Sequence, residues 1–165
     1  LWGAEVEDLY PRDGAAAEAD QAVLAFRSVV NTESYRVDVE DEMGETVFQV
    51  ETRSPEVVIP AGVLEPGTEY YWRVRGSGRR SLSGRGEALF VTLAPADAVA
   101  LEAFRSAAEA DGSVSALLLL AEAERSLGLY REACAVLDRV GGKAPENQHV
   151  VAAREVFACA EYGGR

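Results

Sequence analysis

The sequence predicts a chain in two parts, an all-β part followed by an all-α part. Before residue 93, short apolar runs alternate with polar residues, as in Ser34–Glu40, and turn signals rich in Gly, Pro and Asp separate them. After Pro95 the apolar residues take the spacing of amphipathic helices. We therefore expect an antiparallel β-sandwich over residues 1–93 and an α-helical domain over residues 97–163, the latter a small bundle of about four helices.

The segment Leu64–Arg75 is typical of a turn that leads into a buried strand. The Pro-Gly pair at 66–67 suits the central positions of a type II turn, and the residues after it alternate. Tyr70, Trp72 and Val74 share the face that we expect to be buried. A Tyr placed shortly after such a turn predicts a tyrosine corner, in which the hydroxyl bonds to the upstream backbone.

The remaining β elements follow from the same alternation. The segments 34–40 and 45–51 form a predicted hairpin in which Phe48 and Val50 face the core and Val47 faces solvent. Further strands are expected within 5–11, 22–30, 57–59, 68–75 and 88–93, with a solvent-facing alanine-rich connection at 15–19 and a loop of Gly, Ser and Arg at 76–86.

These segments resemble a fibronectin type III domain over about residues 5–93. The resemblance rests on Tyr35-Arg-Val-Asp-Val, on Leu64-x-Pro-Gly-x-x-Tyr70-x-Trp72-x-Val74 and on the terminal strand. The chain departs from the family at the second strand, where Phe26 takes the place of the Trp that such domains usually carry. The resemblance implies a sandwich that serves protein–protein contact.

Helical segments follow the sandwich. Pro95 stops the last strand, Asp97 is the expected N-cap of the first helix, and Ser113 or Ser115 is that of the second. Helices are expected over 98–110, 117–127, 130–140 and 150–160, with Gly141-Gly142 ending the third.

The stretch from Leu117 to Asn147 resembles one tetratricopeptide repeat, within a helical segment of about residues 97–161. The matching positions are Leu117, Leu120, Ala121, Gly128, Tyr130, Ala133, Leu137 and Pro145. Glu124 departs from the motif, which prefers an aromatic residue there. The resemblance implies protein–protein contact, and because a single repeat cannot bury its own faces, the first and last helices must cover it.

The chain carries a net charge of −12, from 28 acidic and 16 basic residues. Such a surface repels phosphate backbones, so nucleic-acid binding is not expected. No run of about 18 apolar residues marks a membrane-spanning helix. The start at Leu1-Trp2 suggests a segment of a longer protein, with a membrane anchor upstream as one option; in the alternative, Trp2 begins the first strand.

The two cysteines, Cys134 and Cys159, match no zinc pattern, and a chain with one histidine lacks the ligands for such a site. We interpret them as two small buried side chains. A disulfide between neighbouring helices is the alternative in an oxidising compartment. No metal or other cofactor is expected.

The sequence contains no phosphate-binding loop, dinucleotide fingerprint, metalloprotease motif or nucleophile elbow. His149 has no partner nucleophile and is interpreted as a surface residue at a helix N-terminus. The acidic run Glu40-Asp41-Glu42 lacks the alternating ligands of a calcium loop, so a solvated turn is expected. We therefore predict that the chain is not an enzyme.

Arginines supply the main candidate contact surface. Within this acidic chain, one short stretch holds Arg73, Arg75, Arg79, Arg80 and Arg85. Loops at the ends of sandwiches often bind ligands, so we predict a contact with an anion or an acidic partner there. The alternative is a flexible, soluble loop.

A second candidate surface is the groove between the last helices. Tyr130 and Arg131 are the predicted binding residues there, beside Glu124 and Arg154.

These features favour a non-catalytic protein–protein interaction module, the soluble part of a larger bacterial protein. The pairing of the two resemblances is similar to the extracytoplasmic part of membrane-anchored regulators of the anti-sigma type. It implies a periplasmic or cell-surface location, while a cytoplasmic one stays open. The alternative function is an accessory or spacer domain of a polysaccharide-acting extracellular enzyme, for which Tyr71 is the one outward aromatic expected on the corner strand.

Overall fold

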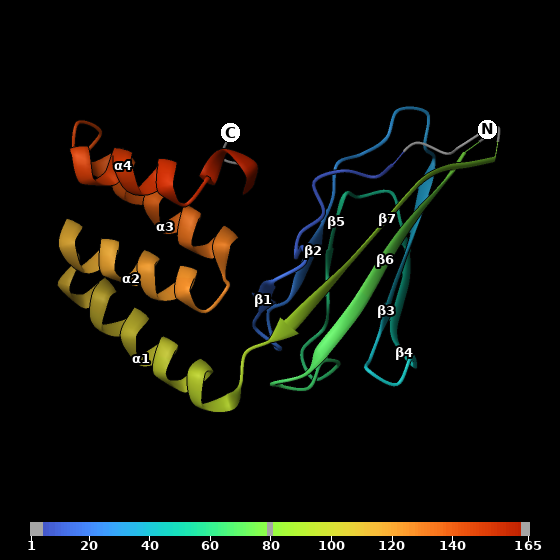
Figure 1. Ribbon diagram of the computed structural model, residues 1–165, viewed down its shortest axis with the longest axis horizontal. Helices are drawn as coiled ribbons and strands as arrows, with labels where there is room; N and C mark the ends of the chain where they lie inside the picture. The colour runs from blue at the N-terminus through green and yellow to red at the C-terminus, as the bar shows by residue number, and fades with distance from the viewer. Residues whose placement is uncertain (1–4, 79–80, 163–165) are drawn as a thin grey trace. The chain divides into compact units, whose positions relative to one another are not determined.

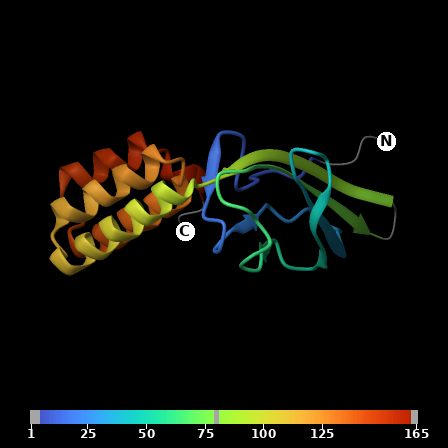
Figure 2. The same cartoon turned by 90° about the horizontal axis from the view of Figure 1, so that it is seen from below.

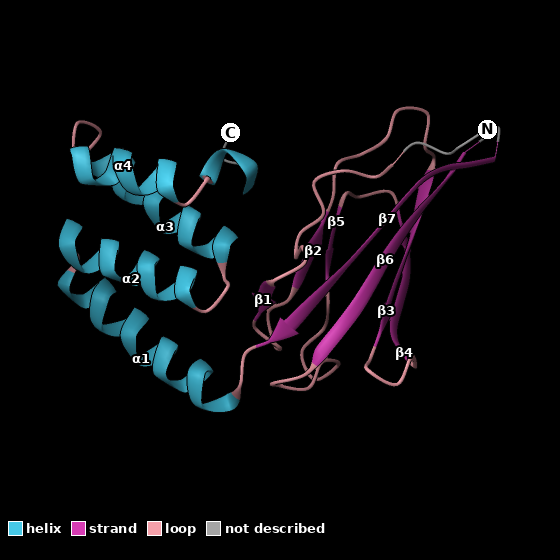
Figure 3. Cartoon of the chain, viewed as in Figure 1, coloured by secondary structure: helices cyan, strands magenta, loops and turns pink. Residues whose placement is uncertain are grey.

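The computed structural model describes residues 5–78 and 81–162. The chain divides into two compact units, Leu1–Ala94 and Pro95–Arg165, the first built of strands and the second of helices (Figure 3). The fold class predicted from the sequence, an all-β part followed by an all-α part, is confirmed.

The first unit is a β-sandwich of two unequal sheets (Figure 1). The larger sheet has the strand order β1-β7-β6-β3-β4, with β1 Ala15–Ala17, β3 Ser34–Glu40, β4 Thr46–Thr52, β6 Glu69–Gly78 and β7 Ser81–Thr92. Its neighbours are antiparallel, except that β1 runs parallel to β7. The smaller sheet pairs β2, Val23–Ala25, with β5, Glu56–Val58, in antiparallel orientation.

The core lies between the two sheets and follows from the two-residue period of the strands. Trp72 on β6 is fully buried, and its indole Nε1 donates a 2.8 Å hydrogen bond to the Pro11 carbonyl. Phe26, the residue in place of the usual Trp, packs on Tyr35 with ring centroids 4.7 Å apart. The other buried residues of this core include Leu24, Val37, Val39, Val57, Ile59, Tyr70, Val74 and Phe90.

The predicted tyrosine corner is present. Tyr70 is buried, and its hydroxyl accepts a 2.8 Å hydrogen bond from the backbone N–H of Glu65. Gly67 takes the positive φ, 70°, that the turn requires. The Thr92 hydroxyl of β7 donates to the Glu65 carbonyl at 2.6 Å and accepts from the Thr68 N–H at 3.0 Å. The corner therefore ties the start of β6 to the end of β7.

Two predictions for the N-terminal stretch are wrong. Residues 5–11 form no strand, because Glu5 and Tyr10 make only single bridges, to Arg85 and Ala25. The alanine-rich stretch expected to face solvent contains the buried strand β1. Three consecutive alanines show no alternation of polarity, and their small side chains let this strand lie against β7 without crowding the core.

The predicted loop 76–86 is also wrong, because its described residues belong to a long antiparallel hairpin. β6 continues to Gly78 and β7 begins at Ser81, and the two strands run side by side in both views (Figure 1, Figure 2). One of the glycines that suggest a loop, Gly86, serves packing. A Cβ on Gly86 would lie 2.8 Å from Leu9 Cδ1 and 2.9 Å from the Val6 carbonyl oxygen, so the close approach of the N-terminal segment requires glycine.

The predicted hairpin of 34–40 and 45–51 corresponds to β3 and β4, with one difference. The register shifts between Val39 and Glu40, as at a β-bulge, and Val47 packs half-buried against the core instead of facing solvent. The strand expected over 22–30 is shorter, since β2 has only three residues.

The second unit contains α1 Pro95–Asp111, α2 Val114–Ser126, α3 Tyr130–Lys143, α4 Gln148–Val156 and the 3-10 helix η1 Cys159–Tyr162. Ser113 is the N-cap of α2, where its hydroxyl accepts the Ala116 N–H at 3.1 Å. No helix among the residues that the structure describes is both long and apolar enough to cross a membrane.

Three helix boundaries differ from the prediction. α1 begins at Pro95, which lacks the N–H that a first turn leaves unbonded, so Asp97 lies inside the first turn and is not the cap. α3 continues through Gly141 and Gly142, which keep helical geometry. α4 stops at Val156, before Cys159.

Helices α2 and α3 form the centre of this unit. Ala121 and Ala133 are fully buried, and such small side chains let the two helices approach closely. Glu124, expected in the groove, is buried instead, and Arg105 of α1 donates from Nε to its Oε1 at 2.9 Å. An ion pair between α1 and α2 thus accompanies the burial of Glu124.

Replacing Tyr70 with Phe removes the acceptor of the part-buried hydrogen bond from the Glu65 N–H. We expect the free energy of unfolding of the sandwich to fall by about 1–3 kcal/mol, measured by urea denaturation followed through tryptophan fluorescence. Val58→Thr, at an exposed position of β5, is the control and should change stability by less than about 0.5 kcal/mol. A Tyr70→Phe variant as stable as the wild type would contradict a stabilising role for the corner.

Replacing Gly86 with Ala places a methyl group against a backbone carbonyl. We expect a loss of about 1–3 kcal/mol, measured by thermal denaturation monitored by circular dichroism. Gly142→Ala in α3, where no atom lies within 4 Å of the new Cβ, is the matched control and should stabilise its helix by about 0.5–1 kcal/mol. An unchanged Gly86→Ala variant would mean that the segment around Val6 and Leu9 moves away at no cost.

Candidate functional site

The outer face of the large sheet carries a network of charged residues. Its rows across β3, β6 and β7 are Arg36, Arg75 and Arg85; Asp38, Arg73 and Glu87; and Glu40, Tyr71 and Leu89. These side chains share one face because the residues between them, such as Val37 and Val74, point into the core.

Asp38 is the centre of this network and is buried, with 3% of its surface exposed. Its Oδ1 accepts hydrogen bonds from Arg36 Nε at 3.0 Å and from Gln49 Nε2 of β4 at 2.6 Å, and its Oδ2 accepts one from Arg75 Nη2 at 2.7 Å. Burial by itself raises the pKa of Asp38, but the hydrogen bonds from Arg75, Arg36 and Gln49 outweigh it and hold the pKa below its ordinary value. The carboxylate is therefore charged at neutral pH.

Tyr71 and Glu87 extend the network along β6 and β7. The Arg73 guanidinium lies over the Tyr71 ring, 5.4 Å from its centroid, while its Nη2 donates to Glu40. The pKa of the Tyr71 hydroxyl is raised, mainly by burial and secondly by a hydrogen bond with Glu87. Hydrogen bonds from Tyr71 and Arg85 lower the pKa of Glu87. The face is thus a continuous series of charge-assisted contacts.

The arginines around Asp38 lie nearer to solvent than the carboxylate that they bind. The side chain is 49% exposed in Arg36 and 40% exposed in Arg75, against 4% in Asp38. This part of the sheet therefore presents the guanidinium groups of Arg36 and Arg75 to solvent, and the buried Asp38 carboxylate fixes their positions.

The structure brings three of the predicted binding arginines together. Arg73, Arg75 and Arg85 lie on this face, with Arg85 on β7 instead of in a loop, and each is paired with a carboxylate. Arg79 and Arg80 lie outside the described residues.

The sequence did not single out Gln49 and Glu87 as members of the network, nor Asp38 and Arg36 of β3. Their alternation within β3 indicates an outward face. The register that sets them beside Arg75 and Arg73 depends on a pairing between distant strands, which local sequence does not specify.

The other predicted binding residues, Tyr130 and Arg131, lie at the start of α3. Tyr130 is half-buried, and its ring stacks on Tyr162 of η1 with centroids 5.8 Å apart and an interplanar angle of 21°. The predicted binding surface is therefore covered on one side by the segment that follows α4.

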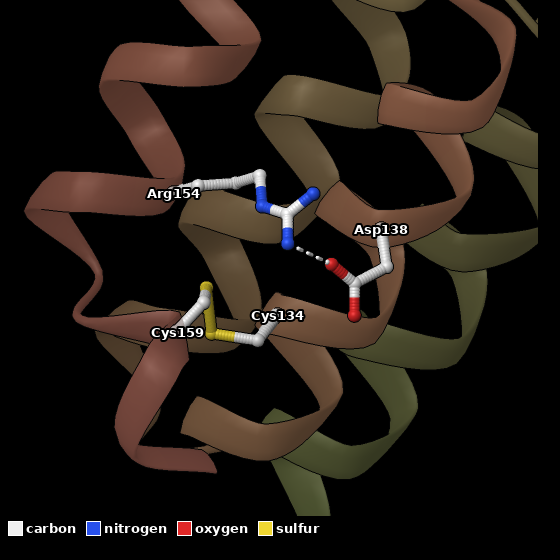
Figure 4. The surroundings of a disulfide bond; sticks show 4 residues. All are labelled: Cys134, Asp138, Arg154 and Cys159. Carbon is white, nitrogen blue, oxygen red and sulfur yellow. Dashed lines mark ion pairs between the residues drawn. A yellow bond between two sulfur atoms is a disulfide. The ribbon is translucent and has the colours of Figure 1, made fainter. Parts of the chain in front are cut away.

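Cys134 and Cys159 form a disulfide, with Cα atoms 5.4 Å apart (Figure 4). Both cysteines are buried, as interpreted, but they are not separate side chains, and the disulfide alternative is correct. The pairing depends on a reversal of the chain at Ala158, with φ 52°, which returns η1 to α3. Beside the disulfide, Arg154 of α4 reaches Asp138 of α3 at 2.9 Å.

The remaining candidates take structural positions. His149 is exposed in the first turn of α4. In the acidic run, Glu40 binds Arg73, and Asp41 accepts the backbone N–H groups of Met43 and Glu45 at 2.9 Å each. Within residues 5–78 and 81–162, no group of three or more His, Cys, Asp or Glu side chains could hold a metal ion.

The sequence matches no protein-family model and no curated protein sequence. Solved structures similar to this chain match its β part. They include CopC from Methylosinus trichosporium OB3b, with 17% identity, a TM-score of 0.43 and coverage of 56% of this chain and 95% of that one. A structure of FN3tt has 14% identity, a TM-score of 0.43 and coverage of 56% and 98%. The fn3 domain of human collagen alpha-1(XX) chain has 18% identity, a TM-score of 0.43 and coverage of 56% and 90%.

Replacing Asp38 with Asn removes the charge that Arg36 and Arg75 share. We expect a loss of about 2 kcal/mol at neutral pH, since a buried charged contact is broken. The folded pKa of Asp38 lies below its ordinary value of 3.8. The stabilisation is therefore complete above about pH 5 and is lost as the pH falls through the folded pKa.

Urea denaturation of the wild type and of Asp38→Asn, from about pH 7 down to about pH 2.5, measures this difference, which should shrink at the acidic end. Asp20→Asn, at an exposed turn position, is the control and should differ little from the wild type throughout. A difference that stays constant with pH would contradict the ionic role of Asp38.

Proposed function

We propose that this chain is a non-catalytic protein–protein interaction module of a larger bacterial protein, and that the arginine-bearing face of its large sheet binds an acidic partner. The observation that supports this most is the buried Asp38, which fixes Arg36 and Arg75 with their guanidinium groups toward solvent. No catalytic role is assigned to any residue.

Two properties of these arginines favour this face as a contact surface. An arginine already held by a carboxylate has less conformational freedom to lose on binding than a free one. Arginine is also enriched at protein interfaces, because its planar group forms paired hydrogen bonds with carboxylates. The strands beneath are held by the Trp72 core, so the guanidinium groups keep their spacing.

The disulfide supports a location outside the cytoplasm, since disulfides persist in oxidising compartments. The parent protein in this proposal is a membrane-anchored regulator of the anti-sigma type, with this chain as its periplasmic or cell-surface part. The acidic composition, with a net charge of −12, argues against nucleic acid as the partner.

In this proposal the helical unit is a tetratricopeptide-like domain, and it too serves protein–protein interaction. The hairpin of α2 and α3 has Gly128 at its turn, with φ 85°, and fully buried Ala121 and Ala133 between its helices. In this proposal Tyr130 and Arg131 belong to a second contact surface.

The alternative, an accessory domain of a polysaccharide-acting enzyme, has less support. A sugar platform needs an aromatic ring open to solvent. Tyr71 is half-buried, lies beneath the Arg73 guanidinium and bonds to Glu87.

Affinity capture from a cell-envelope extract of the source organism tests the proposal. The baits are the wild type, the triple variant Arg36→Gln, Arg75→Gln, Arg85→Gln, and a control variant Arg27→Gln, Arg139→Gln, whose arginines form exposed ion pairs elsewhere. We expect the wild type and the control to retain one protein. At low salt, the triple variant should retain about tenfold less of that protein. Equal retention by a folded triple variant, checked by circular dichroism, would contradict binding at this face.

A further inference from the structure

The last described α-helix, α4, has few buried side chains. Val150 is its one buried residue, whereas Val151 and Val156 are 48% and 73% exposed. The Arg154–Asp138 ion pair joins α4 to α3, but its side chains are 44% and 41% exposed, so solvent screens it. At the C-cap of α4, the Phe157 ring also lies under the Arg125 guanidinium of α2, with its centroid 5.1 Å from the guanidinium carbon. One buried side chain and these two charged contacts therefore hold α4 only weakly.

After α4, the segment η1 contacts α3 around the disulfide. Cys159 of η1 bonds to Cys134 of α3, and in Figure 4 this bond lies close to the Arg154–Asp138 pair. Tyr162 then stacks on Tyr130. The disulfide is thus the one covalent link that keeps η1, and with it the end of α4, on α3.

The rest of the helical unit has a core of its own. α2 and α3 make the most extensive helix–helix contact in the unit, and α1 adds the buried Leu101 and Ala108 and the Arg105–Glu124 pair. The disulfide closes between α3 and η1 only. Breaking it removes no contact among α1, α2 and α3.

We infer that residues 148–162 form a redox-releasable cover on the Tyr130 side of α3. A dithiol reductant supplies two electrons and two protons: the bond between Cys134 and Cys159 breaks, two thiols form, and the dithiol becomes a disulfide. α4 and η1 then leave α3, while α1–α3 and the sandwich stay folded.

Release uncovers the Tyr130 ring, because Tyr162 moves away with η1. The meaning of this exposure for binding rests on the proposed function, which places a contact surface at Tyr130. The release itself does not depend on any partner.

Hydrogen–deuterium exchange of the whole chain, read by mass spectrometry with and without a phosphine reductant, tests the inference. We expect amides of residues 150–160 to exchange at least about tenfold faster after reduction, and those of α2 and β6 to change less than about twofold. The double variant Cys134→Ser, Cys159→Ser should exchange like the reduced protein in both conditions. Arg154→Gln, which keeps the disulfide, should stay protected when oxidised.

Three results would overturn the inference. Equal protection of residues 150–160 before and after reduction would show that packing holds the segment. Equal loss of protection in α2 would show that the disulfide stabilises the whole unit. Lost protection in oxidised Arg154→Gln would assign the attachment to the ion pair. None of these readouts involves partner capture, so each is separable from a failure of the sheet-face proposal.

Discussion

Strand β6 serves the core and the candidate contact face at once, because successive side chains of a strand point to opposite sides. Tyr70 and Trp72 lie in the core, and Tyr71, Arg73 and Arg75 lie on the outer face. A shift of one residue in register would expose the rings and bury the arginines. The hydrogen bonds from the Trp72 indole to the Pro11 carbonyl and from the Glu65 N–H to the Tyr70 hydroxyl oppose that shift. The position of the arginines opposite Asp38 is therefore a consequence of core packing.

Local pattern was sufficient wherever one element determines its own structure. The alternation of Ser34–Glu40 and the Pro-Gly turn before Tyr70 predicted β3 and the tyrosine corner, and Ser113 was one of two predicted caps. The helix boundaries at Asp97 and Gly141 were local errors, whereas the failures in the sandwich involve contacts between distant segments. Ala15–Ala17 forms a strand only because β7 lies beside it. Gly86 is a packing residue only because Leu9 crosses it.

Contacts between distant segments also explain why the candidate site was predicted only in part. The arginines of 73–85 stand out by composition, but their carboxylate partners come from β3 and β7, and only strand pairing shows which acid meets which base. For the cysteines, a sequence separation of 25 residues left the question open, and the reversal at Ala158 decided it. Both units contain a buried carboxylate, Asp38 or Glu124, that is bound by an arginine from another element.

The parallel pairing of β1 with β7 has a consequence for synthesis. Ala15 leaves the ribosome early, whereas its partner Phe90 belongs to the last strand of the unit. Until that strand emerges, the nascent sandwich lacks β7, which is the partner of both β1 and β6, and so displays an unpaired edge of β6. Translation that stalls after β6 and before the end of β7 at Thr92 would therefore leave this edge exposed and favour aggregation.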